Sequence, residues 1–166
     1  MKIGLFFGSF NPMHIGHKVI ASYMAEFSDL EKVVFVVSPQ NPFKEKKSLL
    51  NQQHRLQIIR AEVEDNEILD VSDIEFKMPQ PSYTIDTLVR LKEQHPTNDY
   101  ALIMGADNLQ NFHKWKNYEQ ILEDYSIYLY PRPGIEINGT HENIHIVKGV
   151  PQMEISASFI RNSIKD

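Results

Sequence analysis

The feature that most restricts the fold of this chain is an alternation of short, continuously apolar runs with segments of helical hydrophobic spacing. A run that is apolar at every position predicts a strand buried on both faces, as in a parallel sheet covered by helices. The alternation therefore predicts an α/β fold with a doubly wound, mostly parallel sheet and helices on both faces. Strands are expected at residues 3–7, 33–37, 101–104 and 126–130, with weaker signals at 68–71 and 144–147, and helices at 17–27, 52–63 and 84–93.

Composition narrows the class of protein. The chain has no cysteine, which excludes disulfides and cysteine-ligated metal sites and suits a reducing cytoplasm. Its net charge of -5 argues against a protein that coats nucleic acid, because such proteins neutralise phosphates with many Lys and Arg side chains. No apolar run approaches the ~20 residues that span a bilayer. We therefore expect a single cytoplasmic domain over residues 1–166, with no nucleic-acid or membrane partner, and the sequence leaves open whether it forms a homo-oligomer.

The stretch GSFNPMHIGH (residues 8–17) lies between the first predicted strand and the first predicted helix. Gly8 can adopt backbone angles that other residues resist, and Pro12 keeps the residue before it out of the helical region, so a tight loop is expected. His14 and His17 are then expected in the first turn of the helix, on one face. Free N–H groups and the helix dipole attract anions there. The sequence therefore predicts a phosphate site with two added imidazole donors.

The two histidines have simpler interpretations as well. Two histidines at the start of a helix can cap it, or they can form part of a metal site. A catalytic zinc needs a third protein ligand, and the chain has no cysteine to supply one. The residues alone thus leave capping open and favour no metal site.

The whole string resembles the signature of the nucleotidyltransferase superfamily, Gly-x-Phe-x-Pro-x-His-x-Gly-His, which follows the first strand of a Rossmann-like domain. Its histidine part also resembles class I aminoacyl-tRNA synthetases, but 166 residues leave no room for their additional domains. Near the other end, ISASFIR (residues 155–161) is similar to the superfamily element Ile-Ser-x-Thr/Ser-x-Ile-Arg. There Ser156 and Ser158 can cap a helix and bind phosphate, and Arg161 offers a planar fork to the β- and γ-phosphates of ATP. Without the resemblance, a helix cap followed by an exposed arginine is the simpler interpretation.

Three further segments resemble one family, the bacterial nicotinate-nucleotide adenylyltransferases. They are SPQNPFK (38–44), PSYTIDTL (81–88) and GADNLQNFHKWKNYEQIL (105–122). The resemblance implies a Rossmann-like fold and adenylyl transfer from ATP to nicotinate mononucleotide, giving deamido-NAD and pyrophosphate in NAD biosynthesis. It also implies Mg²⁺ bound mainly through the ATP phosphates.

These segments contain candidate substrate-binding residues, each with an alternative role. Lys44 can bring a positive charge to phosphate, or it can be a solvated loop lysine. Trp115 can stack on a pyridine ring, or it can be a partly buried anchor. Backbone amides around Thr84 and Tyr118 can bind a carboxylate. The resemblance places Asp107 beside the nucleotide, although this side chain can also cap the helix that follows it.

The residues and the resemblance together define three predicted groups. The catalytic group is His14, His17, Lys44 and Arg161; the ATP-binding group is Gly8, Ser9, Phe10, His14, His17, Asp107, Ser156, Ser158 and Arg161; the nicotinate mononucleotide group is Asn11, Lys44, Tyr83, Thr84, Trp115 and Tyr118. Two other functions stay open: a related adenylyltransferase that uses nicotinamide mononucleotide or phosphopantetheine, and a non-catalytic nucleotide-binding regulator.

Overall fold

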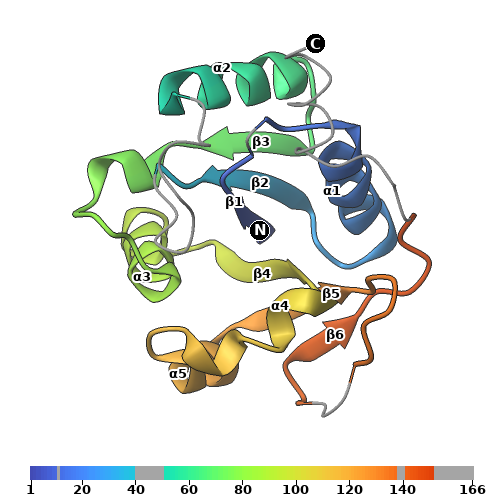
Figure 1. Cartoon of the computed structure of the whole chain (residues 1–166). Coiled ribbons are helices and arrows are strands. Elements are labelled where there is room, and N and C mark those ends of the chain that lie inside the picture. The colour runs from blue at the N-terminus through green and yellow to red at the C-terminus, as the bar shows by residue number, and fades with distance from the viewer. Residues whose placement is uncertain (11, 40–50, 138–140, 152–166) are drawn as a thin grey trace.

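The sheet is the organising element of the computed structural model, which describes residues 1–10, 12–39, 51–137 and 141–151. Six strands, all parallel to their neighbours, lie in the order β3-β2-β1-β4-β5-β6 (Figure 1). The strands are β1 (Lys2–Gly8), β2 (Lys32–Val37), β3 (Leu69–Ser72), β4 (Asp99–Gly105), β5 (Ser126–Tyr130) and β6 (Ile144–Ile146). The predicted doubly wound sheet is confirmed, and it is parallel throughout the described residues.

Helices cover both faces of this sheet. The apolar residues of α1 (Ile15–Phe27) and α2 (Gln52–Val63) join one hydrophobic cluster, and those of α3 (Thr84–Gln94) and α5 (Tyr118–Asp124) join another. The short helix α4 (Ala106–Leu109) and the 3₁₀ turns η2 (Ile74–Lys77) and η3 (Phe112–Lys114) also add to the second cluster. The three predicted helices are confirmed, whereas α4, α5 and the 3₁₀ turns were not predicted. No helix in the described ranges is long and apolar enough to cross a membrane.

The continuous apolar runs follow from this two-sided burial. On β1, Phe6 packs in the cluster under α1 and α2, while Ile3 and Leu5 pack in the cluster under α3. On β4, Ile103 and Leu102 divide between the two clusters in the same way. Because successive side chains point to opposite faces of a strand, every position must be apolar when both faces are covered.

The strand order determines where a ligand can bind. The chain passes from β1 to β2 on one side of β1, and it later returns to place β4 on the other side. Such a reversal leaves a crevice beyond the carboxyl ends of the two central strands. Those ends are Gly8 of β1 and Gly105 of β4. The loop after β1 with the start of α1, which carries the two histidines, and the start of α4 therefore flank the crevice.

Candidate active site

The loop after β1 turns at Phe10, and the backbone freedom expected of Gly8 is not used there. Phe10 has a positive φ of 48°, in the left-handed region, whereas Gly8 continues the extended strand and pairs with Val37. A Cβ at Gly8 would lie 3.1 Å from the Phe10 ring, a tight contact that the ring could accommodate only by shifting. The absence of a side chain at Gly8 thus lets the Phe10 ring fold back into the core, where it is 3% exposed.

His14 is the N-cap of α1, one step before the first turn in which it was expected. Its Nδ1 accepts a hydrogen bond from the Gly16 amide at 3.0 Å, and Nδ1 of His17 accepts one from the His14 amide at 3.1 Å. The two imidazoles form a reciprocal capping box, a role that Ser and Glu side chains usually fill. The capping interpretation is therefore confirmed. As a result, two of the amides expected to face a phosphate donate to imidazole nitrogens instead.

The capping bonds determine where each imidazole carries its proton. A neutral imidazole whose Nδ1 accepts a hydrogen bond has its N–H at Nε2. The two rings are stacked with centroids 3.9 Å apart and planes at 28°, and the His17 ring meets Phe10 edge-on at 5.0 Å. In their neutral forms, these two adjacent imidazoles therefore carry their N–H groups at Nε2.

Arg132 supplies a positive charge at the carboxyl edge of the sheet, and it was not among the predicted site residues. It lies two residues after β5, and its Nε is 3.8 Å from the Asp107 carboxylate in a half-exposed ion pair. Burial, and next the charge of Arg132, lower the pKa of His14 and so favour its neutral, capping form. Arg132 follows the carboxyl end of a predicted parallel strand, and this position in the sequence could have identified it as a site residue.

Asp107 does not cap the helix that follows it. α4 begins at Ala106 with Gly105 as its N-cap, and Asp107 lies inside the first turn with its carboxylate toward Arg132. The capping alternative is therefore wrong. The ion pair instead connects the end of β4 with the segment after β5, beside the crevice.

The start of α3 differs from that of α1. Its N-cap residue is Tyr83, which makes no side-chain capping hydrogen bond, so the amides of the first turn at Thr84 are left uncapped by it. The Tyr83 ring is 41% exposed, and Nζ of Lys116 lies 4.9 Å from its centroid and 3.3 Å from the carboxylate of Asp86. Lys116 thus joins the two segments that were expected to receive the acceptor nucleotide.

Trp115 and Tyr118 follow on the second of those segments. The Trp115 ring is partly buried and lies 5.2 Å from the Phe112 ring, which confirms the interpretation of Trp115 as a partly buried anchor. The Tyr118 amide donates to the Trp115 carbonyl at 3.2 Å. Because that amide is engaged within the chain, the start of α3 is the better of the two expected carboxylate sites.

Two buried charged side chains lie beneath these loops, and the sequence analysis selected neither. Arg55, 1% exposed, donates through Nη1 to the carbonyls of Ser9 at 2.7 Å and Ser38 at 2.6 Å. Glu75, 3% exposed, accepts hydroxyl hydrogen bonds, and its burial raises the pKa of the carboxyl while those bonds oppose the rise. The position of Arg55 four residues before Ile59, on the apolar stripe of α2, was a usable signal; Glu75 had none.

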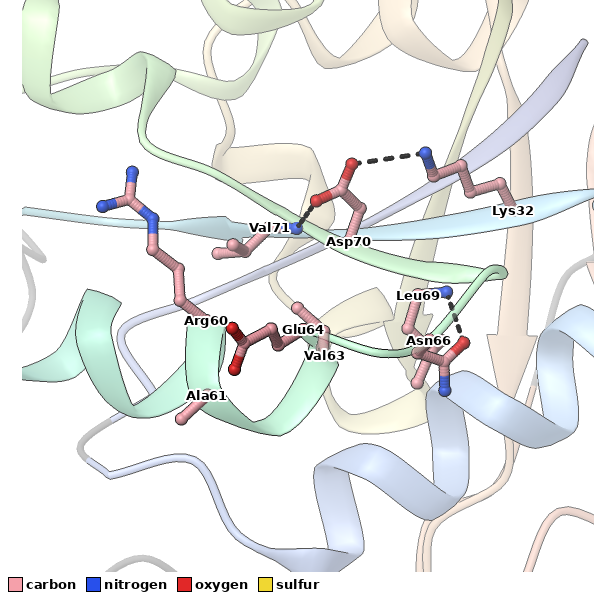
Figure 2. A pocket seen from close by; sticks show the side chains of 9 residues that line it. All are labelled: Lys32, Arg60, Ala61, Val63, Glu64, Asn66, Leu69, Asp70 and Val71. Atoms are coloured by element: carbon pink, nitrogen blue, oxygen red, sulfur yellow. Dashed lines mark hydrogen bonds and ion pairs between the residues drawn. The ribbon is translucent and has the colours of Figure 1, made fainter.

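The remaining predicted residues and one separate hollow complete the description. Asn11, Lys44, Ser156, Ser158 and Arg161 lie outside the described residues, so their roles stay predictions. A hollow of about 710 Å³ lies between α2 and the edge strand β3, as Figure 2 shows, and none of the predicted site residues line it. Two of its charged residues, Lys32 and Asp70, pair with each other at 3.2 Å. It is not the crevice at the carboxyl ends of β1 and β4.

The comparisons with known protein families and with curated relatives agree with each other. The profile of the cytidylyltransferase-like family matches residues 5–163. The chain is 52% identical over 171 residues to the "Probable nicotinate-nucleotide adenylyltransferase" of Flavobacterium johnsoniae, covering 100% of this chain and 88% of that protein. It is 53% identical over 169 residues to the protein of the same name from Christiangramia forsetii, covering 99% and 87%.

Two solved structures share the fold. One is described as "Plasmodium falciparum nicotinic acid mononucleotide adenylyltransferase complexed with NaAD", with a TM-score of 0.81 at 18% identity over 97% of this chain and 82% of that chain. The same protein "complexed with APC" gives a TM-score of 0.77 at 18% identity, with the same coverage. At this identity the likeness concerns the fold alone.

Proposed function

Because this chain belongs to the cytidylyltransferase-like family and, within it, to the nicotinate-nucleotide adenylyltransferases, we propose that it transfers the adenylyl group of ATP to nicotinate mononucleotide in NAD biosynthesis. The products are deamido-NAD and pyrophosphate. The observation that carries this proposal is the pair of stacked histidines at the carboxyl end of β1, whose Nδ1 atoms accept the capping hydrogen bonds.

The reaction needs no protein nucleophile. An oxygen of the 5′-phosphate of nicotinate mononucleotide attacks the α-phosphorus of ATP, a new P–O bond forms, and the bond from the α-phosphorus to the bridging oxygen breaks, releasing pyrophosphate. Catalysis is then the positioning of two phosphates and the stabilisation of developing negative charge. We assign the donor role to Nε2–H of His14 and His17, and we retain Lys44 and Arg161 as predicted counter-charges.

A divalent metal is general in nucleotidyltransferases of this family. We propose that it is Mg²⁺, bound mainly by ATP phosphate oxygens and water, and that it supplies charge neutralisation when bound. Within residues 1–10, 12–39, 51–137 and 141–151, no group of three or more His, Asp and Glu side chains could hold an ion.

We place the acceptor at the start of α3. The amides near Thr84 that Tyr83 leaves uncapped can donate to the carboxylate of the nicotinate ring, and the positive end of the α3 dipole favours that negative charge. Lys116 adds a cation next to Tyr83. We retain Asn11, Trp115 and Tyr118 as predicted neighbours of the pyridine nucleotide, and Gly8, Ser9, Phe10 and Asp107 as predicted neighbours of ATP.

The test is pyrophosphate release from MgATP with each candidate acceptor in turn. We expect kcat/KM for nicotinate mononucleotide to exceed that for nicotinamide mononucleotide by at least about 10²-fold, because a carboxamide presents an NH₂ donor to amides that are themselves donors. Phosphopantetheine is expected to be inactive. Equal use of the acid and the amide would contradict the acceptor assignment, and no release with any acceptor would favour a nucleotide-binding regulator.

The cysteine-free composition supports a cytoplasmic location for this enzyme. We retain the prediction that its partners are small substrates and not nucleic acid or membrane. The oligomeric state stays open.

A further inference from the structure

A buried carboxylate joins the end of β2 to the start of α3. Glu75 accepts hydrogen bonds from the hydroxyls of Thr87 at 2.8 Å, Ser82 at 3.0 Å and Ser38 at 3.3 Å. Ser38 directly follows β2, Ser82 precedes α3, and Thr87 lies in its first turns. The carboxylate therefore connects the carboxyl edge of the sheet with the start of α3.

The Ser38 end of this connection is itself held in place. The Ser38 carbonyl accepts a hydrogen bond from Nη1 of Arg55 at 2.6 Å, and the same Nη1 donates to the Ser9 carbonyl in the histidine loop at 2.7 Å. Nη2 of Arg55 also donates to the Pro39 carbonyl at 2.9 Å. Ser38 is thus fixed relative to the loop that precedes His14, and Glu75 extends that fixed frame to α3.

The α3 end of the connection brackets the uncapped turn. Ser82 and Thr87 lie on either side of Tyr83 and Thr84, so both of their bonds to Glu75 hold the segment whose amides face the acceptor. Thr87 is fully buried, and its hydroxyl also lies 3.2 Å from the Tyr83 carbonyl. A shift of Glu75 would therefore move the first turn of α3 against the histidine loop.

A carboxylate serves this purpose in a way that an apolar side chain cannot. Burying a carboxylate without a cationic partner costs free energy, and hydrogen bonds offset that cost only when the donors are directed at its oxygens. The three hydroxyls satisfy this requirement at one relative placement of their segments. Apolar packing would tolerate sliding of α3 over the sheet, because it has no such directional requirement.

We propose that Glu75 is a positioning residue that sets the start of α3 at the distance from the histidine loop at which the acceptor nucleotide binds, and so governs acceptor affinity and not ATP affinity. The proposal rests on the acceptor assignment made above. Glu75 acts through Thr87 and Ser82, and it touches neither substrate.

The experiment compares Thr87→Val with Thr87→Ser. Valine keeps the volume of threonine but removes the hydroxyl bond to Glu75, whereas serine keeps the hydroxyl. We expect Thr87→Val to raise KM for nicotinate mononucleotide about 10-fold while KM for ATP stays within about 2-fold, because misplacement of a binding element weakens the group that it contacts. Thr87→Ser is expected to restore KM for nicotinate mononucleotide to within about 2-fold of the parent protein.

Glu75→Gln extends the test, and Glu93→Gln is its control, since Glu93 lies exposed in the last turn of α3. The first variant is expected to raise KM for the acceptor at least as much as Thr87→Val, and the control to leave both KM values unchanged. The positioning role would be overturned if KM for ATP rose as much as KM for nicotinate mononucleotide. It would also be overturned if neither Glu75→Gln nor Thr87→Val raised KM for nicotinate mononucleotide. If Glu75→Gln does not fold, the Thr87 pair decides alone. Lack of activity with nicotinate mononucleotide in the parent protein would instead overturn the proposed function.

Discussion

The starts of α1 and α3 both face the carboxyl edge of the sheet, yet they satisfy their backbone amides in opposite ways. In α1, the side chains of His14 and His17 accept hydrogen bonds from the Gly16 and His14 amides. In α3, the N-cap residue Tyr83 makes no side-chain capping bond. The imidazoles of α1 cap their own helix start, whereas the N-cap side chain of α3 does not cap its helix.

This difference indicates that the start of a helix can be arranged for two kinds of anion. At α1 we propose that the Nε2–H groups of the imidazoles, and not the capped amides, donate to a phosphoryl group. At α3 we propose that the backbone amides of the first turn donate to the planar carboxylate of the acceptor. We therefore expect that substitutions which exchange the two capping arrangements change activity and stability independently of each other.

The largest effect is expected from His17→Glu. A glutamate at this position can accept the His14 amide bond as in an ordinary capping box, but it has no proton to donate and repels phosphate. We expect kcat/KM for ATP to fall at least about 10²-fold, the scale for loss of a donor that stabilises developing charge. Steady-state pyrophosphate release at saturating acceptor measures this loss.

His17→Ala is the matched variant for that test. It removes both the donor and the cap, so it should lose activity and also unfold at a lower temperature than His17→Glu. Activity of His17→Glu within about threefold of the parent protein would show that α1 needs only its cap.

A smaller effect is expected when α3 is closed like α1. Tyr83→Asp places a carboxylate at the N-cap, where it can accept hydrogen bonds from the amides that are assigned to the acceptor. We expect KM for nicotinate mononucleotide to rise about 10-fold or more, because the ligand carboxylate must displace an internal one. The melting temperature should stay level or rise, since a cap contributes about 1 kcal/mol.

Tyr83→Ala separates the cap from the loss of the ring, which also holds the contact with Lys116. Alanine removes the ring without closing the helix start, so it should raise KM for the acceptor less than aspartate does and add no stability. If alanine and aspartate raise KM equally, the Tyr83 ring and not the open amides binds the acceptor.

The smallest effect concerns pH. Burial and the charge of Arg132 lower the pKa of His14 below its ordinary value of 6.5, and a protonated Nδ1 cannot accept the Gly16 bond. The unfolded chain therefore binds a proton more readily at this residue, so stability from His14 is complete above pH 6.5 and declines as the pH falls below it. The free energy of unfolding, measured by urea denaturation between about pH 5 and 8, should show this decline.

His14→Asn provides the comparison for this measurement. Asparagine is a good N-cap and does not titrate, so the variant should keep most of the stability at pH 8 and show a shallower decline toward pH 5. Superimposable pH profiles for the two proteins would place the titration elsewhere in the chain.

Much of the fold could be predicted from local patterns. The apolar runs located all six strands, and the order of strands and helices predicted the doubly wound sheet. The helix α4 and the 3₁₀ turn η3 were missed because four and three residues are too few to show a helical period, and the seven residues of α5 are barely two turns. Periodicity is informative only over longer windows.

In the candidate site, as in the fold, only the features that depend on neighbouring residues in the sequence could be predicted. The stretch from Gly8 to His17 was identified because all of its residues are adjacent in the chain. The positive φ of Phe10, and the use of the two imidazoles as acceptors in a capping box, became visible only in three dimensions. Which side of an imidazole caps a helix depends on the ring's rotation, and no residue spacing contains that information.

Local patterns in the sequence therefore predicted the six strands of the described sheet, the three longer helices, their burial on two faces and the location of the histidine pair, since each depends on neighbours within a few turns. Only the tertiary structure decided that Arg132 meets Asp107, that Arg55 holds Ser9 to Ser38, and that Glu75 gathers three hydroxyls. Most of these contacts join residues far apart in the chain, as in the bond between Arg55 and Ser9. They arise because the parallel sheet brings the carboxyl ends of its strands to one edge, where burial and direct contact determine the charge and orientation of each group.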